Sequence, residues 1–155
     1  MTTNYQLRSL LTADGEASLF FEEVSVPELG DDQVLIQVQA APINPSDLAL
    51  LTAAMDLETL ESSGEGFATR VKAQAKPGAT QFFAARIGMS LETGNEGAGT
   101  VVAAGSSAAA QRLLGKTVSA FGGAMYAQYR VAHVMECLEL PERASAADGA
   151  STRTL

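Results

Sequence analysis

Alternation of apolar and polar residues is clearest in the first third of the chain. Val34, Ile36 and Val38 share one face of a run whose intervening residues are mostly polar. A period of two predicts a half-buried β-strand. A Phe- and Val-rich run over residues 16–26 predicts another strand, and the Pro and Gly within residues 27–31 suit a reversal. We therefore expect these two strands to be antiparallel neighbours.

The later part of the chain predicts further short strands and one short helix. Residues 116–121 form a strand candidate that Gly122 and Gly123 end, and residues 125–131 resume the alternation. Residues 108–114 have the composition of a short helix. Weaker patterns predict a strand over residues 135–140 and a helix over residues 46–55 with Ser46 as its cap.

The pattern degrades between these elements, over residues 51–92, into mixed helical and loop signals. We interpret this segment as an excursion from the β core. Many short strands with a few helical turns favour a mainly β, barrel-like domain over alternating β-α-β units.

Composition narrows the possible partners. The 155 residues suit one globular domain, and 18 acidic against 10 basic residues give a net charge of −8. Such a chain repels phosphate backbones and anionic lipids, so neither nucleic acid nor membrane is expected as a partner. The single cysteine, Cys137, cannot form an internal disulfide or a thiolate-rich zinc site. Without an apolar leader or a long apolar run, the sequence predicts a cytoplasmic setting.

Two prolines stiffen the segment that follows the first alternating strand. Pro42 and Pro45 fix φ around Asn44 and precede Ser46 and Asp47. A stiff turn holds polar side chains in defined directions, which suits a site that orients a substrate. The segment can equally be a strand-to-helix connection in which Ser46 or Asp47 caps the helix, and local pattern alone favours this second interpretation.

A glycine-rich run over residues 94–105 contains Gly97 and Gly99 in the spacing of a nucleotide fingerprint. A dinucleotide loop follows a strand and opens a helix, whereas these glycines lead into Thr-Val-Val, a β-prone run. The sequence therefore favours small residues that let two backbones pass closely in a curved sheet.

Several of these segments, taken in order, resemble one known family. They are the opening strand pair, the turn at 41–48, the run at 94–105, and residues 114–118 and 123–129. In this order they resemble the N-terminal GroES-like catalytic domain of the medium-chain dehydrogenase/reductase superfamily. The resemblance implies a partly open β-barrel, without the Rossmann domain that follows it in the superfamily. We expect residues 1–145 to form the GroES-like domain, with the excursion at 51–92, and residues 146–155 to begin the hinge to a missing cofactor domain.

The resemblance also bears on zinc. Asn44 matches the cysteine, and Asn95 the histidine, that bind catalytic zinc in the zinc alcohol dehydrogenases of this superfamily. An amide oxygen is a weak zinc donor, so no zinc is expected here. Asp47 and Glu96 match carboxylates that lie behind the zinc ligands, and we expect them to organise the pocket by hydrogen bonds.

Among zinc-free relatives, the chain looks most like NADPH-dependent quinone oxidoreductases and enoyl thioester reductases. This implies hydride transfer from NADPH to a quinone or enone, with the protein supplying orientation. The implied catalytic residues are Asn44 and Asp47, and those implied beside the cofactor are Asn44, Pro45, Asn95 and Glu96. Enoyl thioester reductases carry a tyrosine shortly after the turn, and its absence between Tyr5 and Tyr126 favours the quinone side. The chain alone is expected to be inactive.

Other interpretations stay open. One alternative is a non-catalytic binding or assembly module of GroES-like fold, and self-association as a homo-oligomer is a further possibility. Tyr126 and Tyr129 fall on opposite faces of their expected strand, so at most one faces the cleft. His133 and Cys137 invite a metal or redox interpretation, but packing and surface roles are expected for both.

Overall fold

The computed structural model describes residues 3–150, which divide into two compact units. Within the described residues, the first unit contains 3–4, 23–43 and 94–150, and the second contains 5–22 and 44–93. The described residues form two five-stranded sheets, one in the first unit and the other mainly in the second. Of the segment predicted to begin a hinge, residues 146–155, the last five lie outside the described part of the chain, and the hinge itself stays a prediction.

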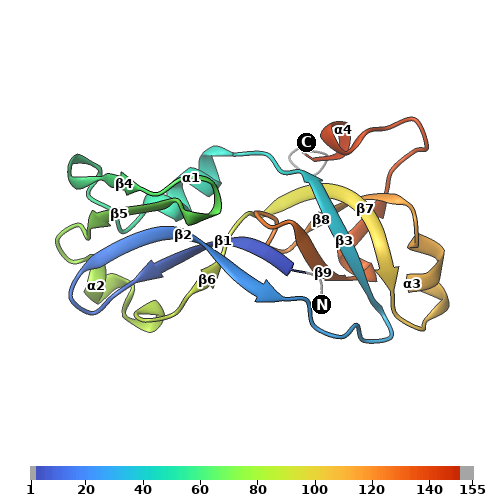
Figure 1. Ribbon diagram of the computed structural model, residues 1–155, viewed down its shortest axis with the longest axis horizontal. Coiled ribbons are helices and arrows are strands. Elements are labelled where there is room, and N and C mark those ends of the chain that lie inside the picture. The colour runs from blue at the N-terminus through green and yellow to red at the C-terminus, as the bar shows by residue number, and fades with distance from the viewer. Residues whose placement is uncertain (1–2, 151–155) are drawn as a thin grey trace. The chain divides into compact units, whose positions relative to one another are not determined.

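The sheet of the first unit has the strand order β10-β8-β7-β3-β9, and all its neighbouring strands are antiparallel. Its elements are β3 (Gln33–Ala40), β7 (Glu96–Ala104), α3 (Ala108–Leu113), β8 (Thr117–Phe121), β9 (Tyr129–His133) and β10 (Cys137–Glu139). Figure 1 shows β7 curving strongly along its length. The core is formed by Val34, Ile36, Val101, Ala110, Leu113, Val118, Ala120, Met125 and Ala132. The expected mainly β, barrel-like fold is thus confirmed, as are the alternating strand at β3 and the helix at α3.

Glycines allow the close approach of β3 and β7. A Cβ atom at Gly99 would lie 2.0 Å from the Gln37 carbonyl oxygen, and one at Gly97 would lie 2.8 Å from that of Ala40. The β3–β7 register shifts twice, next to Leu35 and next to Val38. Irregularities of this kind bend a strand and increase its twist. The expectation of small residues in a tightly curved sheet is confirmed.

The expected pairing of β3 with the preceding strand is wrong. β2 (Glu16–Ser25) pairs with β5 (Arg70–Gln74), whereas β3 is a central strand with β7 on one edge and β9 on the other. Both edges of β3 are therefore occupied. The connection between β2 and β3 bonds elsewhere, because Asp31 accepts a hydrogen bond from the Ser107 backbone N–H at 3.0 Å.

The strand expected over residues 125–131 begins later, at Tyr129. Gly122, Gly123 and Ala124 all have positive φ, so the chain is still turning where the alternation starts. Met125 is fully buried in the core instead of lying in the ladder. The opposite-face argument for Tyr126 and Tyr129 fails, because only Tyr129 belongs to β9.

The sheet of the second unit has the order β4-β5-β2-β1-β6. Its elements are β1 (Thr3–Leu11), β2, α1 (Pro45–Thr52), β4 (Glu61–Ser63), β5 (Arg70–Gln74), α2 (Ala79–Phe82) and β6 (Leu91–Glu92), with 3₁₀ turns at Leu57–Thr59, Gly66–Ala68 and Ala84–Arg86. Figure 1 shows β1 and β2 as its longest strands. Its core is formed by Leu11, Ala17, Ala54, Met55, Ala73 and Ala79. Residues 51–92 thus build most of this unit's short elements.

Two short helical segments complete the structure. A 3₁₀ turn at Val134–Glu136 precedes β10, so the strand expected over 135–140 is shortened to three residues. Helix α4 (Ala146–Gly149) begins after Ser145, whose hydroxyl accepts a hydrogen bond from the Asp148 N–H at 3.3 Å. Over residues 3–150, we find no helix with the length and apolar character needed to cross a membrane.

Candidate functional site

The turn that carries Asn44 opens helix α1. Asn44 is the N-cap residue, with extended backbone angles, and Pro45 occupies the first helical turn. The Asp47 carboxylate accepts a hydrogen bond from the Asn44 backbone N–H at 3.0 Å. The expected cap at Ser46 is wrong, because Pro45 has a suitable φ for the first helical position and moves the helix start by one residue. The hydrogen bond between Asp47 and the Asn44 N–H caps the helix, and this cap restricts the backbone of the turn.

Burial separates the polar residues of this turn. Asp47 is only 3% exposed, Asn44 is half-buried, and Pro45 is exposed. The buried Asp47 carboxylate bonds the Asn44 N–H and so holds the backbone from which the Asn44 side chain extends. Asp47 can therefore position Asn44, whose carboxamide offers both a donor and an acceptor.

Asn95 and Glu96 stand where β7 begins. Glu96 is 8% exposed, whereas Asn95 is exposed. The Asn95 carbonyl oxygen accepts hydrogen bonds from the Gly122 N–H at 3.2 Å and the Gly123 N–H at 3.4 Å. The loop between β8 and β9 therefore fixes the main chain that carries the Asn95 side chain.

Tyr126 extends this arrangement. Its hydroxyl donates a hydrogen bond to the Pro42 carbonyl oxygen at 2.8 Å. Tyr129 makes its contacts elsewhere, because its backbone N–H and carbonyl both bond the side chain of Asn4, at 2.9 and 2.7 Å. The sequence left open which tyrosine lies near the predicted site segments. A pattern of alternation cannot reveal a contact between residues 84 positions apart.

The predicted site residues come from both units. Asn44, Pro45 and Asp47 belong to the second unit, and Asn95 and Glu96 belong to the first. Within each unit they are neighbours at the start of one element, α1 or β7. Their assembly into one site stays a prediction.

The glycine run does not fit nucleotide phosphates. Gly97 and Gly99 lie inside β7, and the space that a phosphate would need is filled by the backbone of β3. A phosphate-binding loop instead presents free N–H groups at the start of a helix. The described residues of this run therefore serve strand packing.

The metal candidates have other partners. His133 Nδ1 accepts a hydrogen bond from the Met135 N–H at 3.1 Å, and the Cys137 thiol donates to the His133 carbonyl at 3.6 Å. Across residues 3–150, no three His, Cys, Asp or Glu side chains are grouped so that they could hold a metal ion. His133 caps the 3₁₀ turn that follows it, which is a structural role.

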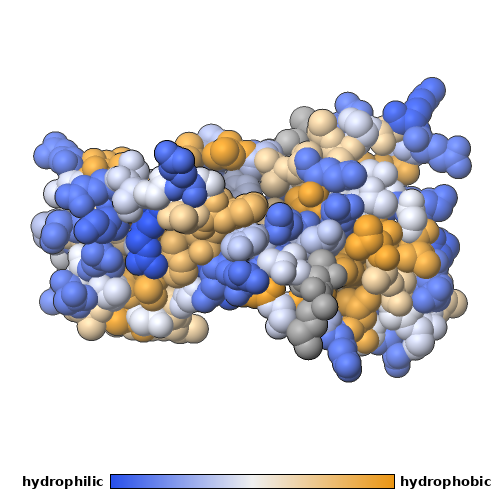
Figure 2. Space-filling model, viewed as in Figure 1, coloured by the Kyte–Doolittle hydropathy of each residue, from blue (hydrophilic) through white to orange (hydrophobic). Residues whose placement is uncertain are grey.

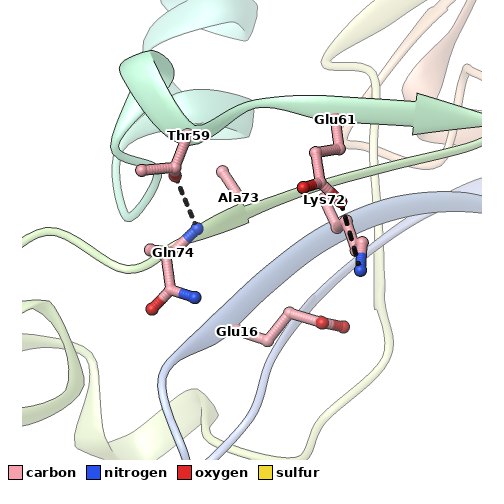
Figure 3. Close-up of a pocket in the computed structure, with 6 residues that line it drawn as sticks. All are labelled: Glu16, Thr59, Glu61, Lys72, Ala73 and Gln74. Atoms are coloured by element: carbon pink, nitrogen blue, oxygen red, sulfur yellow. Dashed lines mark hydrogen bonds and ion pairs between the residues drawn. The ribbon is translucent and has the colours of Figure 1, made fainter.

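A shallow surface cavity of about 310 Å³ lies within the second unit, lined by Glu16, Thr59, Glu61, Lys72, Ala73 and Gln74. Figure 3 shows two polar contacts on either side of Ala73. Lys72 Nζ pairs with Glu61 at 3.4 Å, and the Gln74 N–H donates to the Thr59 hydroxyl at 2.8 Å. Exposed ion pairs of this kind contribute little, about 0–1 kcal/mol. These contacts join β5 to the segment before it and are explained by the fold.

A more buried ion pair also lies in the second unit. Arg8 Nε bonds Glu22 at 2.6 Å, and the Ser90 hydroxyl donates to the same carboxylate at 3.2 Å. The Arg8 side chain is 15% exposed and that of Glu22 is 39% exposed. The hydrogen bond from Arg8 lowers the pKa of Glu22 below its ordinary value. Glu22 therefore stays ionised in the folded protein to a lower pH than an ordinary glutamate does.

Apolar surface is present outside the cores. Figure 2 shows a cluster of apolar surface in the region of β7 and α3, where Val102 and Leu114 are exposed. In the second unit, Phe82 is 83% exposed. Single exposed apolar residues are normal in proteins, so they do not by themselves identify an interface.

Comparisons with known proteins agree with the fold. A profile of the alcohol dehydrogenase GroES-like domain matches residues 30–142. A comparison of the sequence with curated proteins gives no match. The fold, however, matches many solved structures, of which four are described next.

The first is a protein from Bacillus thuringiensis provisionally assigned as an NADPH:quinone reductase, with 20% identity and a TM-score of 0.66 over 99% of this chain and 38% of that chain. A protein from Mesorhizobium loti with the same provisional assignment has 26% identity and a TM-score of 0.58, over 97% of this chain and 41% of that chain. The quinone oxidoreductase from Coxiella burnetii has 20% identity and a TM-score of 0.62, over 99% of this chain and 42% of that chain. The enoyl reductase CurK also matches, with a TM-score of 0.63.

The chain therefore spans 38% to 42% of the length of the three quinone reductase structures. The profile covers most of the chain, including all five strands of the curved sheet of the first unit. The family resemblance predicted from the sequence is confirmed: this chain belongs to the alcohol dehydrogenase GroES-like domain family.

Proposed function

We propose that this chain is the substrate-side domain of a zinc-free, NADPH-dependent oxidoreductase that reduces a quinone or an enone. NADPH supplies the hydride in such a reaction, and a proton completes the reduction of the conjugated carbonyl compound. The observation that carries the proposal is the GroES-like profile match over residues 30–142. The quinone and enoyl reductases among the matching folds support this reaction class.

The roles that we assign follow from side-chain chemistry. The carboxamides of Asn44 and Asn95 can donate hydrogen bonds to a substrate or nicotinamide carbonyl and so orient it. Asp47 holds the Asn44 main chain through their 3.0 Å hydrogen bond. Pro45 and the buried Glu96 complete the predicted surroundings of the cofactor. The protein would thus supply orientation and polarisation.

The donor set argues for the zinc-free branch. Asparagine side chains offer amide oxygens at residues 44 and 95, where zinc relatives offer sulfur and imidazole nitrogen. Metal analysis of carefully prepared protein tests this point. One equivalent of tightly bound zinc would overturn it.

NADPH fits the described residues only in part. Its phosphates do not fit at Gly97 and Gly99, because the β3 backbone fills that space. We assign the polar residues of the two predicted segments to contacts with the nicotinamide end. We therefore expect the chain by itself to be inactive in NADPH oxidation. A cytoplasmic setting and a homo-oligomeric state also stay predictions, which cell fractionation and light scattering can check.

The direct test has two parts. In the first, the chain is titrated with duroquinone, a quinone whose four methyl groups disfavour addition of the Cys137 thiol, while side-chain amide signals are followed by NMR. We expect the signals of Asn44 and Asn95 to shift. An N44S/N95A variant, in which serine keeps a capping oxygen at residue 44 but no carboxamide, should lose quinone affinity and keep its unfolding midpoint. Quinone-induced shifts confined to other residues would contradict the proposed site.

The second part measures NADPH oxidation in the presence of duroquinone. We compare the chain with a version extended by a nucleotide-binding domain. Turnover by the extended version alone is the expected result, because Gly97 and Gly99 of the glycine-rich run lie inside a packed strand and do not form a phosphate-binding loop. Equal turnover by the two versions would refute the proposal that this chain supplies only the substrate side and needs a further domain to bind NADPH.

A further inference from the structure

Tyr126 contacts two segments that are far apart in the sequence. Its hydroxyl donates to the Pro42 carbonyl oxygen at 2.8 Å, two residues before Asn44. Its ring lies against Gly94, the residue before Asn95. All three contacting residues belong to the first unit. One side chain therefore touches the main chain next to both asparagines of the proposed site.

The contact with Gly94 leaves no room for a side chain. A Cβ atom at Gly94 would lie 2.6 Å from the Tyr126 nitrogen and 2.8 Å from two ring carbons. Gly94 also has a φ of +87°, which favours glycine. The Met125 N–H donates a hydrogen bond to the Gly94 carbonyl oxygen at 3.2 Å. Gly94 is therefore held both by this main-chain bond and by the Tyr126 ring.

The core does not explain Tyr126. Its neighbour Met125 is fully buried in the core cluster of the first unit, whereas Tyr126 is only half-buried and lies outside that cluster. Tyr126 also precedes β9, so no ladder position requires it. Its hydroxyl and its ring make separate contacts with two different segments, which packing of the barrel alone does not demand.

We propose that Tyr126 is a positioning residue that fixes the two main-chain segments from which Asn44 and Asn95 extend, an inference that rests on the proposed function. The hydroxyl holds the turn at Pro42, and the ring holds Gly94. Because the hydroxyl hydrogen is directed at the Pro42 carbonyl, Tyr126 acts through these segments and not as a proton donor to substrate. A bond between segments 84 residues apart restricts the turn more than its prolines do alone.

Amide hydrogen exchange in the ligand-free chain tests the two contacts separately. Y126F removes the hydroxyl and keeps the ring, so exchange of the Asn44 N–H should become about 2- to 12-fold faster, the factor expected for one net hydrogen bond. Exchange of the Met125 N–H should change less than about twofold, because the ring still covers Gly94. Y126A should accelerate both amides. The Gly115 N–H, which bonds Val101 in the same unit, should stay unchanged throughout.

Y129F is the matched control. Among the interactions described for residues 3–150, Tyr129 bonds through its main chain, so loss of its hydroxyl should accelerate none of these amides. Equal acceleration of all three amides by Y126F would reveal general destabilisation and overturn the proposal. An unchanged Asn44 rate in Y126F would overturn it as well. Y126F alone decides these points if Y126A fails to fold.

Duroquinone binding then tests whether the positioning serves the site. If wild-type protein shows the expected shifts at Asn44 and Asn95, Y126F should bind at least about threefold more weakly, and Y129F should bind like wild type. Equal quinone affinity of wild type and Y126F would overturn the positioning role. The absence of any quinone-induced shift in wild type would refute the proposed function and the positioning role together. In that case a selective exchange effect would identify Tyr126 as a purely structural contact.

Discussion

Replacement of Gly99 by alanine tests the close contact of β3 and β7 most directly. Gly99 lies opposite Val38, and its ideal Cβ would lie 2.0 Å from the Gln37 carbonyl oxygen and 2.8 Å from the carbonyl carbon. Both atoms belong to the backbone of a central strand, so they cannot move as the end of a flexible side chain can. G99A must therefore separate the two strands locally or displace Gln37.

The cost follows from what that separation disrupts. Loss of two or three ladder hydrogen bonds costs about 0.5–1.5 kcal/mol each. Crowding in a packed sheet adds about 1–3 kcal/mol. Alanine restricts the unfolded chain more than glycine does, which returns about 0.4–1 kcal/mol. These terms together give a net loss of about 1–7 kcal/mol, with a midpoint of about 4 kcal/mol, which is a large part of the stability of a typical domain.

Urea unfolding followed by far-ultraviolet circular dichroism measures this loss. G30A is the matched control, because the nearest atom to a Cβ at Gly30 is the Gln33 side-chain oxygen, 3.3 Å away and able to move. We expect G30A to stay within about 1 kcal/mol of wild type. A G99A protein of wild-type stability would refute the packing argument. If it also had a weakened affinity for NADPH, a phosphate-binding role for the glycines would have to be reconsidered.

Two further predictions concern single polar groups. Because Arg8 lowers the pKa of Glu22, the stability from this pair is present at neutral pH and is lost as the pH falls through that lowered pKa. E22Q should therefore destabilise the protein at neutral pH by less than about 1 kcal/mol and flatten the acid decline of the urea midpoint, and an unchanged decline would contradict this. The Ser107 hydroxyl accepts a hydrogen bond from the Ala110 N–H at 3.1 Å at the start of α3. S107A should lower the free energy of unfolding by about 1 kcal/mol, and S107T, which keeps the hydroxyl, should restore most of it; equal stability of the three proteins would exclude a capping role.

Local pattern was sufficient for elements that depend on neighbours in the sequence. Alternation identified β3, whose Val34 and Ile36 are fully buried, because side chains two apart share one face of a strand. The alanine-rich run identified α3, and the β-prone residues after Gly99 identified β7. The same reasoning failed at residues 125–128, because three consecutive positive φ values delay the strand and no pattern of apolar residues reports them.

Pairing could not be determined in this way. The Pro- and Gly-containing connection before β3 suggested a hairpin with β2, yet β7 and β9 occupy both edges of β3. Strand partners are chosen by the burial and register of the whole sheet. The cap of α1 was similarly misplaced from the sequence. The helix begins at Pro45 with Asn44 as its cap, and the buried Asp47 carboxylate accepts a hydrogen bond from the Asn44 N–H. Which residue caps the helix therefore depends on how the turn is packed.

The sequence by itself determined the reaction class proposed for this protein, since the order of its segments indicates the family and the asparagines at 44 and 95 argue against zinc. The sequence also predicted that Gly97 and Gly99 let two backbones pass closely, but only the tertiary structure identified the partner as β3, whose backbone atoms exclude a side chain at both glycines. Only the tertiary structure distinguished Tyr126 from Tyr129, since the Pro42 carbonyl that Tyr126 bonds is 84 residues away. The sequence shows which residue types are present and what chemistry each can perform. Contacts between residues so far apart in the sequence form only when the chain folds.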